Sequence, residues 1–117
     1  MATTTSPVPP TPQAARIYEA ECASGPSGAV LRGAEIDVAT AVARRRAEHD
    51  VVVCGNDLNA NRDLAGRIEA TVGPRSRPQA PEAKAGPLAL PHFHQLSRSP
   101  KGHTFYETAR LKTRKKP

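Results

Sequence analysis

Three of the four histidines lie close together near the C-terminal end of the sequence, at His92, His94 and His103. Imidazole gains and loses a proton near neutral pH, so two histidines can serve one reaction as its base and its acid. Cleavage of RNA by its own 2′-hydroxyl needs such a pair, and it needs no metal ion or other cofactor. A cation must also stabilise the phosphorane, and the candidates for that role are Arg98, Lys101, Arg110 and Lys112.

The chain around these histidines predicts a β-hairpin from about His92 to Thr108. Ser99–Gly102 has proline at its second position and glycine at its fourth, which is typical of a reverse turn. The flanking runs are rich in β-branched and aromatic residues, as strands are. Because side chains alternate across a strand, the first two histidines share one face.

The register of this hairpin decides which other groups meet the first two histidines. In the simplest register Arg98 faces His103, and Glu107 lies with them on the face that holds the other histidines. A slip by one residue would put Thr104 and Tyr106 there instead of His103 and Glu107. Both registers bring at least two histidines together with hydroxyl or carboxylate groups.

Three other interpretations of these residues stay open. His92 and His94 can be ordinary polar residues on a half-exposed strand. A His-x-His pair with a third histidine can bind zinc, with Glu107 as the only nearby fourth ligand. The hairpin can also be a platform for nucleic acid, on which Phe105 and Tyr106 stack with bases.

The last twenty residues, from Arg98 onward, hold seven basic residues and account for the net charge of +6. Basic and acidic residues balance before residue 98, and Glu107 is the only acid after it. Such a cluster predicts a polyanionic partner, with a solvated tail as the alternative. The predicted substrate-binding residues are Arg110, Lys112, Arg114, Lys115 and Lys116.

With 117 residues, few large apolar side chains and 12 prolines, the chain is long enough for one small domain. We expect a disordered leader over 1–12, a single domain over 13–110 and a basic tail over 111–117. The two cysteines make no disulfide framework. The sequence shows neither a membrane span nor a signal peptide, so we expect a soluble protein without membrane partners.

The elements that would position the histidines are read from hydrophobic spacing. Residues 13–22 predict a short helix and residues 34–49 a longer one. The β-branched run 51–54 predicts a buried strand, and residues 59–71 predict a helix that ends at Gly73. We therefore expect an α+β fold in which N-terminal helices pack on a small antiparallel sheet ending in the hairpin, with disordered termini.

The segments Ala85–His94 (AGPLALPHFH) and Gly102–Tyr106 (GHTFY) resemble the C-terminal tips of bacterial polymorphic toxins of the Rhs and contact-dependent type. The preceding strand and helix look similar to the segment before such a tip, so the resemblance covers about residues 50–110. Many of these tips are RNases of the barnase, EndoU, colicin and RelE-like class, with helices packed on a small antiparallel sheet.

The resemblance implies a role for each candidate residue of the hairpin. His92 or His94 would be the general base, and His103 the general acid. The group that stabilises the phosphate charge would be Arg98 or Lys101, and the substrate-positioning groups would be Thr104 and Tyr106.

The resemblance also implies RNA as the substrate, a cognate immunity protein as a partner, and delivery to the cytoplasm of a target cell as part of a secreted toxin. Because the chain begins at Met1 without a delivery region, we expect an orphan, truncated or degenerate module. The alternative function is a non-catalytic module that binds nucleic acid or protein through its basic tail.

Overall fold

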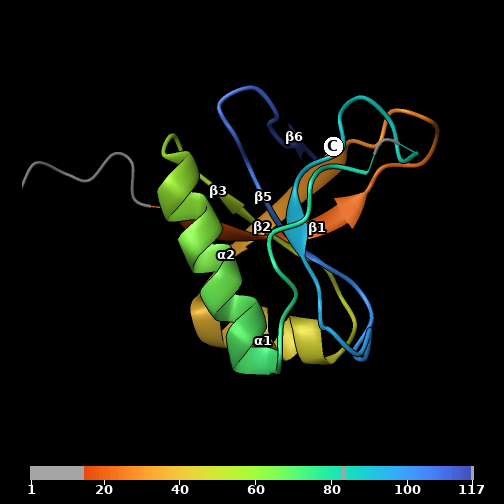
Figure 1. Cartoon of the computed structure of the whole chain (residues 1–117). Helices are drawn as coiled ribbons and strands as arrows, with labels where there is room; N and C mark the ends of the chain where they lie inside the picture. The colour runs from red at the N-terminus through yellow and green to blue at the C-terminus, as the bar shows by residue number, and fades with distance from the viewer. Residues whose placement is uncertain (1–14, 83, 117) are drawn as a thin grey trace, which may run out of the picture.

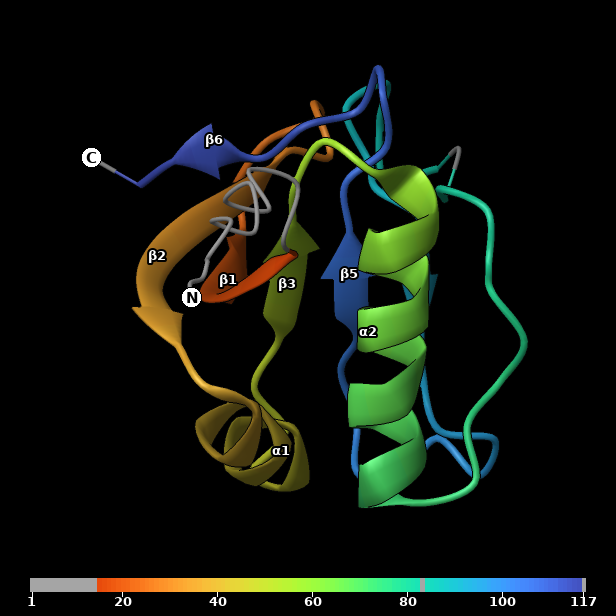
Figure 2. The ribbon, with the colours of Figure 1, turned by 90° about the vertical axis from the view of Figure 1, so that its left-hand side faces the viewer.

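The computed structural model describes residues 15–82 and 84–116, and the predicted leader over 1–12 lies outside them. Within these residues the fold is α+β, with two helices and one six-stranded sheet in the order β4-β5-β3-β1-β2-β6 (Figures 1 and 2). The elements in chain order are β1 (Arg16–Cys22), β2 (Val30–Ile36), α1 (Val38–Arg46), β3 (Val51–Cys54), α2 (Leu58–Val72), β4 (His92–Phe93), β5 (Thr104–Tyr106) and β6 (Arg114–Lys115).

The sheet is mixed and not antiparallel as predicted. β1 lies antiparallel between β2 and β3, and β4 lies antiparallel to β5. β5 runs parallel to β3, and β6 runs parallel to β2. The connection between the parallel strands β3 and β5 runs through α2, the loop after it and β4.

Two apolar clusters fill the two faces of the sheet. Both helices cover one face, where Ala41 of α1 and Ile68 of α2 pack against Val51 and Val53 of β3. On the other face Val52 packs with Leu90, Phe105 and other apolar residues, and this side is covered by loops in place of helices. The predicted strand 51–54 is confirmed as β3. All four of its residues are buried, as expected for an unbroken apolar run in the middle of a sheet that is covered on both faces.

The helix predicted over 13–22 is wrong, because this segment forms β1. Ile17 and Tyr18 are adjacent in sequence but pack into the clusters on opposite faces. The strand pairs with neighbours on both sides, and this pairing outweighs the weak helical spacing of the segment.

The helix predicted over 34–49 is half right, because its first residues belong to β2. α1 begins after Asp37, whose carboxylate accepts a hydrogen bond from the Thr40 backbone nitrogen at 2.8 Å. The second predicted helix is confirmed as α2, which begins after Asp57 and ends before Gly73. Since β1 and β2 precede α1, the helices are not N-terminal to the sheet.

The β4–β5 pair confirms an antiparallel pairing but not the predicted tight hairpin. His92 pairs with Phe105, and a long loop over residues 94–103 joins the strands. The predicted register, with Arg98 facing His103, is wrong because this loop is held by α1 and the segment after it. The backbone nitrogen of Lys101 donates to Glu48 Oε2 at 3.1 Å.

Candidate active site

Three imidazole rings converge where β4, β5 and their connecting loop meet. The ring centroids of His92 and His103 lie 4.6 Å apart, those of His92 and His94 lie 6.1 Å apart, and those of His94 and His103 lie 6.5 Å apart. His92 lies opposite Phe105 on the face of the sheet that the helices leave uncovered, and its ring contacts the Phe105 ring. The structure therefore brings the three predicted histidines together, although the register differs from the predicted one.

Hydrogen bonds define the tautomers of two of these rings. His92 is 6% exposed, and its Nδ1 lies 3.3 Å from the Leu90 carbonyl oxygen. His94 Nδ1 lies 2.8 Å from the Gln95 carbonyl oxygen. Because a carbonyl oxygen only accepts, each Nδ1 holds the proton, and each neutral ring presents an unprotonated Nε2.

The pKa of His103 lies well below the usual value for histidine. Burial is the main cause and the charge of a protonated His92 is the next, and together they lower this pKa from 6.5 to about 4. Burial also lowers the pKa of His92, against the opposing effect of its bond to the Leu90 carbonyl. At neutral pH the ring of His103 is therefore neutral and able to accept a proton.

Asp50 holds the backbone of His103, and sequence reasoning missed it. Its Oδ1 accepts a hydrogen bond from the His103 backbone nitrogen at 2.8 Å and lies 3.9 Å from His103 Nδ1. The negative charge of Asp50 partly offsets the lowering of the His103 pKa. No local sequence signal joins the two residues, because the sheet pairing of β3 with β5 creates their contact.

Two hollows open on either side of His103. One, of about 290 Å³, is lined by His94, His103, Arg98 and Lys101 together with Pro100 and Gly102. The other, of about 180 Å³, is lined by His92, His103 and Phe105 among others. The first hollow joins two predicted acid–base groups with two of the predicted cations, so it offers the setting that a phosphate would need.

A buried ion pair on the opposite face supports this arrangement. Arg45 and Glu69 are both fully buried, and Arg45 Nε donates to Glu69 Oε1 at 2.9 Å. The same carboxylate accepts hydrogen bonds from Gln95 and Thr104, the chain neighbours of two of the histidines. Arg45 also donates to the Lys101 carbonyl oxygen at 2.9 Å, so this pair anchors both ends and the middle of the histidine loop.

Some predicted site residues lie elsewhere. Thr104 is fully buried and donates to Glu69, and Tyr106 is buried in the cluster beneath the helices, so neither faces the histidines. Glu107 is buried too, and its Oε2 accepts from the backbone nitrogen and hydroxyl of Thr113 at 2.8 and 2.7 Å. Across residues 15–82 and 84–116, no three side chains of His, Cys, Asp or Glu are grouped so that they could hold a metal ion.

The basic tail lies at the edge of the sheet remote from β4. In β6, Arg114 pairs with Leu31 and Lys115 with Arg32 (Figure 2). Four strand spacings separate β5 from β6, or about 20 Å at roughly 4.8 Å each. Arg110 and Lys112 line a separate hollow near Leu88. The tail is thus remote from the histidines.

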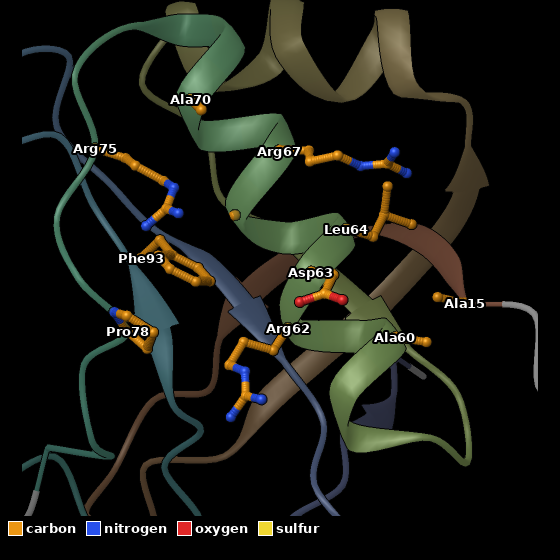
Figure 3. A pocket seen from close by; sticks show the side chains of 11 residues that line it. Ala15, Ala60, Arg62, Asp63, Leu64, Arg67, Ala70, Arg75, Pro78 and Phe93 are labelled. Atoms are coloured by element: carbon orange, nitrogen blue, oxygen red, sulfur yellow. The ribbon is translucent and has the colours of Figure 1, made fainter.

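A larger hollow, of about 770 Å³, runs along α2 on the other side of the molecule (Figure 3). The guanidinium of Arg75 lies over the Phe93 ring at 4.9 Å from its centroid, whereas Arg67 points to the opposite side of the helix. Its lining contains no histidine or cysteine. This shallow surface offers arginine and one aspartate but no proton-transfer pair, so the histidine cluster is the better candidate for chemistry despite its smaller hollows.

Neither of the helices in the described part of the chain is long and apolar enough to cross a membrane. Comparison of the chain with models of known protein families, with curated proteins and with solved structures found no match. The case for a function therefore depends on the side chains of this site.

Proposed function

We propose that this chain is a ribonuclease-like domain that cleaves RNA without a metal ion, by histidine acid–base chemistry. The observation that supports the proposal most is the single hollow lined by His94, His103, Arg98 and Lys101. It combines two proton-transfer groups and two cations, which are the groups that attack by a 2′-hydroxyl on a phosphodiester requires.

The spacing of the rings selects His94 and His103 as the reacting pair. The attacking and leaving oxygens of a phosphoryl transfer lie roughly in line on opposite sides of phosphorus, so the base and the acid must leave room for a phosphate between them. The centroids of His94 and His103 are 6.5 Å apart, whereas those of His92 and His103 are in edge contact at 4.6 Å. His92 is then a positioning residue for His103.

We assign His103 as the base, which reverses the role that the resemblance implies. With its pKa lowered to about 4, chiefly by burial, His103 is neutral at pH 7. Asp50 Oδ1 lies 3.9 Å from its Nδ1 and favours a proton there, which leaves Nε2 to accept. His94, whose Nδ1 donates to a backbone carbonyl, is then the acid in its imidazolium form, in which Nε2 also holds a proton.

In this scheme His103 takes the proton of the 2′-hydroxyl as the 2′-oxygen bonds to phosphorus. The bond from phosphorus to the 5′-oxygen breaks, and His94 gives its proton to that oxygen. Arg98 and Lys101 stabilise the extra negative charge of the phosphorane. The products are a 2′,3′-cyclic phosphate and a 5′-hydroxyl, and proton exchange with water restores both histidines. The resemblance to polymorphic toxin tips supports the same chemistry, and it implies a cognate immunity protein as the partner.

The test is cleavage of labelled RNA by the purified protein in excess EDTA, with analysis of the product ends. We expect 2′,3′-cyclic phosphate ends, no cleavage of the 2′-deoxy analogue, and losses of about 100-fold or more for His94→Ala and for His103→Ala. His49→Ala is the matched control, since His49 is the fourth histidine and is exposed outside the cluster.

Undiminished cleavage by the double variant His94→Ala/His103→Ala would refute the proposal. RNA binding without turnover by the wild-type protein would refute it as well, and would favour the non-catalytic nucleic-acid-binding module.

A further inference from the structure

The larger hollow along α2 has no part in the proton transfers described above. Its volume is about 770 Å³, within the range of about 300–1,000 Å³ that is usual for binding sites. We propose that it is a docking site for an acidic segment of a partner protein, in which carboxylates meet Arg62 and Arg75 and an apolar side chain lies between them. This docking site does not depend on the ribonuclease chemistry proposed above.

Arg75 provides a guanidinium that is already held in place. It lies over the Phe93 ring at 4.9 Å from the centroid, and its Nη1 donates to the Ser76 carbonyl oxygen at 2.9 Å. Arg75 is exposed whereas Phe93 is 2% exposed, so the ring supports the guanidinium from beneath and solvent reaches it from above. The remaining N–H groups are free to donate to a carboxylate, and binding restricts little further side-chain motion.

Gly66 brings α2 close to this stacked pair. A Cβ at this position would lie 3.2 Å from Phe93 Cζ and 3.5 Å from Arg75 Nε. Arg62, Gly66 and Ala70 follow one another at intervals of four residues, so they share one face of α2. Figure 3 shows Arg62 and Arg75 on the same side of the helix as Phe93. The groove on this side of α2 is therefore bordered by one arginine from the helix and one from the segment after it.

The two arginines that border the groove lack an acidic partner within residues 15–82 and 84–116. Arg44 and Arg45 of α1 lie 3.7 and 2.9 Å from carboxylate oxygens, but no ion pair in this part of the chain includes Arg62 or Arg75. Arg62 donates instead to the side-chain oxygen of Asn59 at 2.8 Å, which is neutral. Two positive charges are thus left without an opposite charge, and a ligand with two carboxylates complements them.

An acidic polypeptide suits this groove better than a nucleic acid does. Seven of the eleven described residues that line it have no polar side-chain atom, which favours a ligand that carries apolar groups between its charges. The Phe93 ring is covered by Arg75 and offers no open face to a base. Asp63 would repel a run of phosphates, whereas it can accept the backbone N–H groups of a peptide. The groove also lies on the helix-covered face of the sheet, away from the histidine rings.

The experiment measures the binding of a dye-labelled octapeptide of alternating glutamate and leucine to the full chain, by fluorescence anisotropy at low salt. The same octapeptide with glutamine in place of glutamate is the control for peptide charge. We expect the acidic peptide to bind about tenfold more tightly, as two exposed ion pairs together allow. Its affinity should fall as salt is added, because exposed charges are screened.

Three variants locate the bound peptide. Arg75→Gln should weaken its binding about fivefold, the upper end for an exposed ion pair. Ala70→Glu places a carboxylate at an exposed position in the lining and should weaken binding as much, while the Arg75–Phe93 stack stays in place. Arg32→Gln is the matched control, since Arg32 also lies over an aromatic ring, 5.1 Å from the Tyr18 centroid, on the other face of the sheet. It should change the affinity by no more than about twofold, through long-range charge alone.

Failure of the acidic peptide to bind, or equal binding of the two peptides, overturns the inference. Equal losses in Arg75→Gln and Arg32→Gln overturn it as well, because they would mean attraction to the overall positive charge. A single-stranded DNA octamer that displaces the peptide, and loses the same affinity in Arg75→Gln, would make nucleic acid the occupant. Inhibition of RNA cleavage by the peptide would place its binding at the histidines and overturn the inference. Peptide binding in a chain that does not cleave RNA retains this docking site and removes the proposed function alone.

Discussion

Replacing Glu69 by glutamine should destabilise this protein more than any surface substitution. The Glu69 carboxylate is fully buried and accepts hydrogen bonds from Arg45, Gln95 and Thr104. In Glu69→Gln the guanidinium of Arg45 stays buried without an opposite charge, and the new amide NH₂ points its hydrogens at groups that also donate. Both effects disfavour the folded state.

The expected loss follows from the burial of both partners. Removing one partner of a buried ion pair costs about 3–5 kcal/mol, because the remaining charge keeps its desolvation penalty. The whole stability of a domain is about 5–15 kcal/mol, so the variant should retain a fold but with a much lower unfolding midpoint. Urea unfolding followed by far-UV circular dichroism measures the change, with an unchanged slope as evidence that two-state unfolding persists.

The double variant Arg45→Met/Glu69→Leu is the matched control. It removes both charges and fills their space with apolar side chains, so it should recover much of the stability that Glu69→Gln loses. A loss below about 1 kcal/mol for Glu69→Gln, the level of an ordinary hydrogen bond, would refute the reasoning. A double variant no more stable than the single one would refute it equally.

Three further measurements test other parts of the structure. In an NMR titration, His103 should have a pKa near 4, chiefly because of burial, and a pKa above 6 would contradict this expectation. Because this folded-state pKa lies below the unfolded value, the stability of the wild-type protein should fall as the pH drops from about 6.5 toward 4. The stability of His103→Gln should fall less over the same range. The thiol of Cys54 is buried and its pKa is raised to about 12, mainly by burial. A disulfide reagent should therefore modify only the exposed Cys22 in the native protein, and both thiols in denaturant. Modification of the two thiols at equal rates in the native protein would contradict the burial of Cys54. Neutralising the basic residues of 112–116 should weaken RNA binding and lower the slope of log K against log salt by about one for each phosphate that the tail no longer neutralises. The single-turnover rate at saturating RNA should stay unchanged. A loss of that rate as large as the loss in His103→Ala would mean that the tail takes part in the reaction itself.

Local signals were enough for the central part of the fold. Val51–Cys54 is an unbroken β-branched and sulfur-containing run, and it forms the strand that is buried on both faces. α2 spans Leu58–Val72 and ends before Gly73, close to the predicted range 59–71. These elements are set by side chains close to one another in sequence, and tertiary contacts agree with the local preferences.

The strands β1 and β2 were not predicted from the sequence, because their local alternation is weak and their strand pairing depends on tertiary contacts. Ile17 and Tyr18 fit a helical stripe as well as an alternating strand. β1 becomes a strand because it pairs with β2 on one side and β3 on the other. Context of this kind decides the structure of short segments more than their own composition does.

The sequence by itself determined that three histidines and two cations, Arg98 and Lys101, fall in one short segment, and that alternation along a strand gives His92 and His94 a shared face. Only the tertiary structure decided which groups meet. The register of β4 against β5 was set by contacts of the loop with Glu48, Asp50 and Arg45, which lie in a distant part of the sequence. Those contacts bury Thr104 and bring His103 against His92, because a loop of this length takes its shape from the surfaces that bind it and not from its own turn residues.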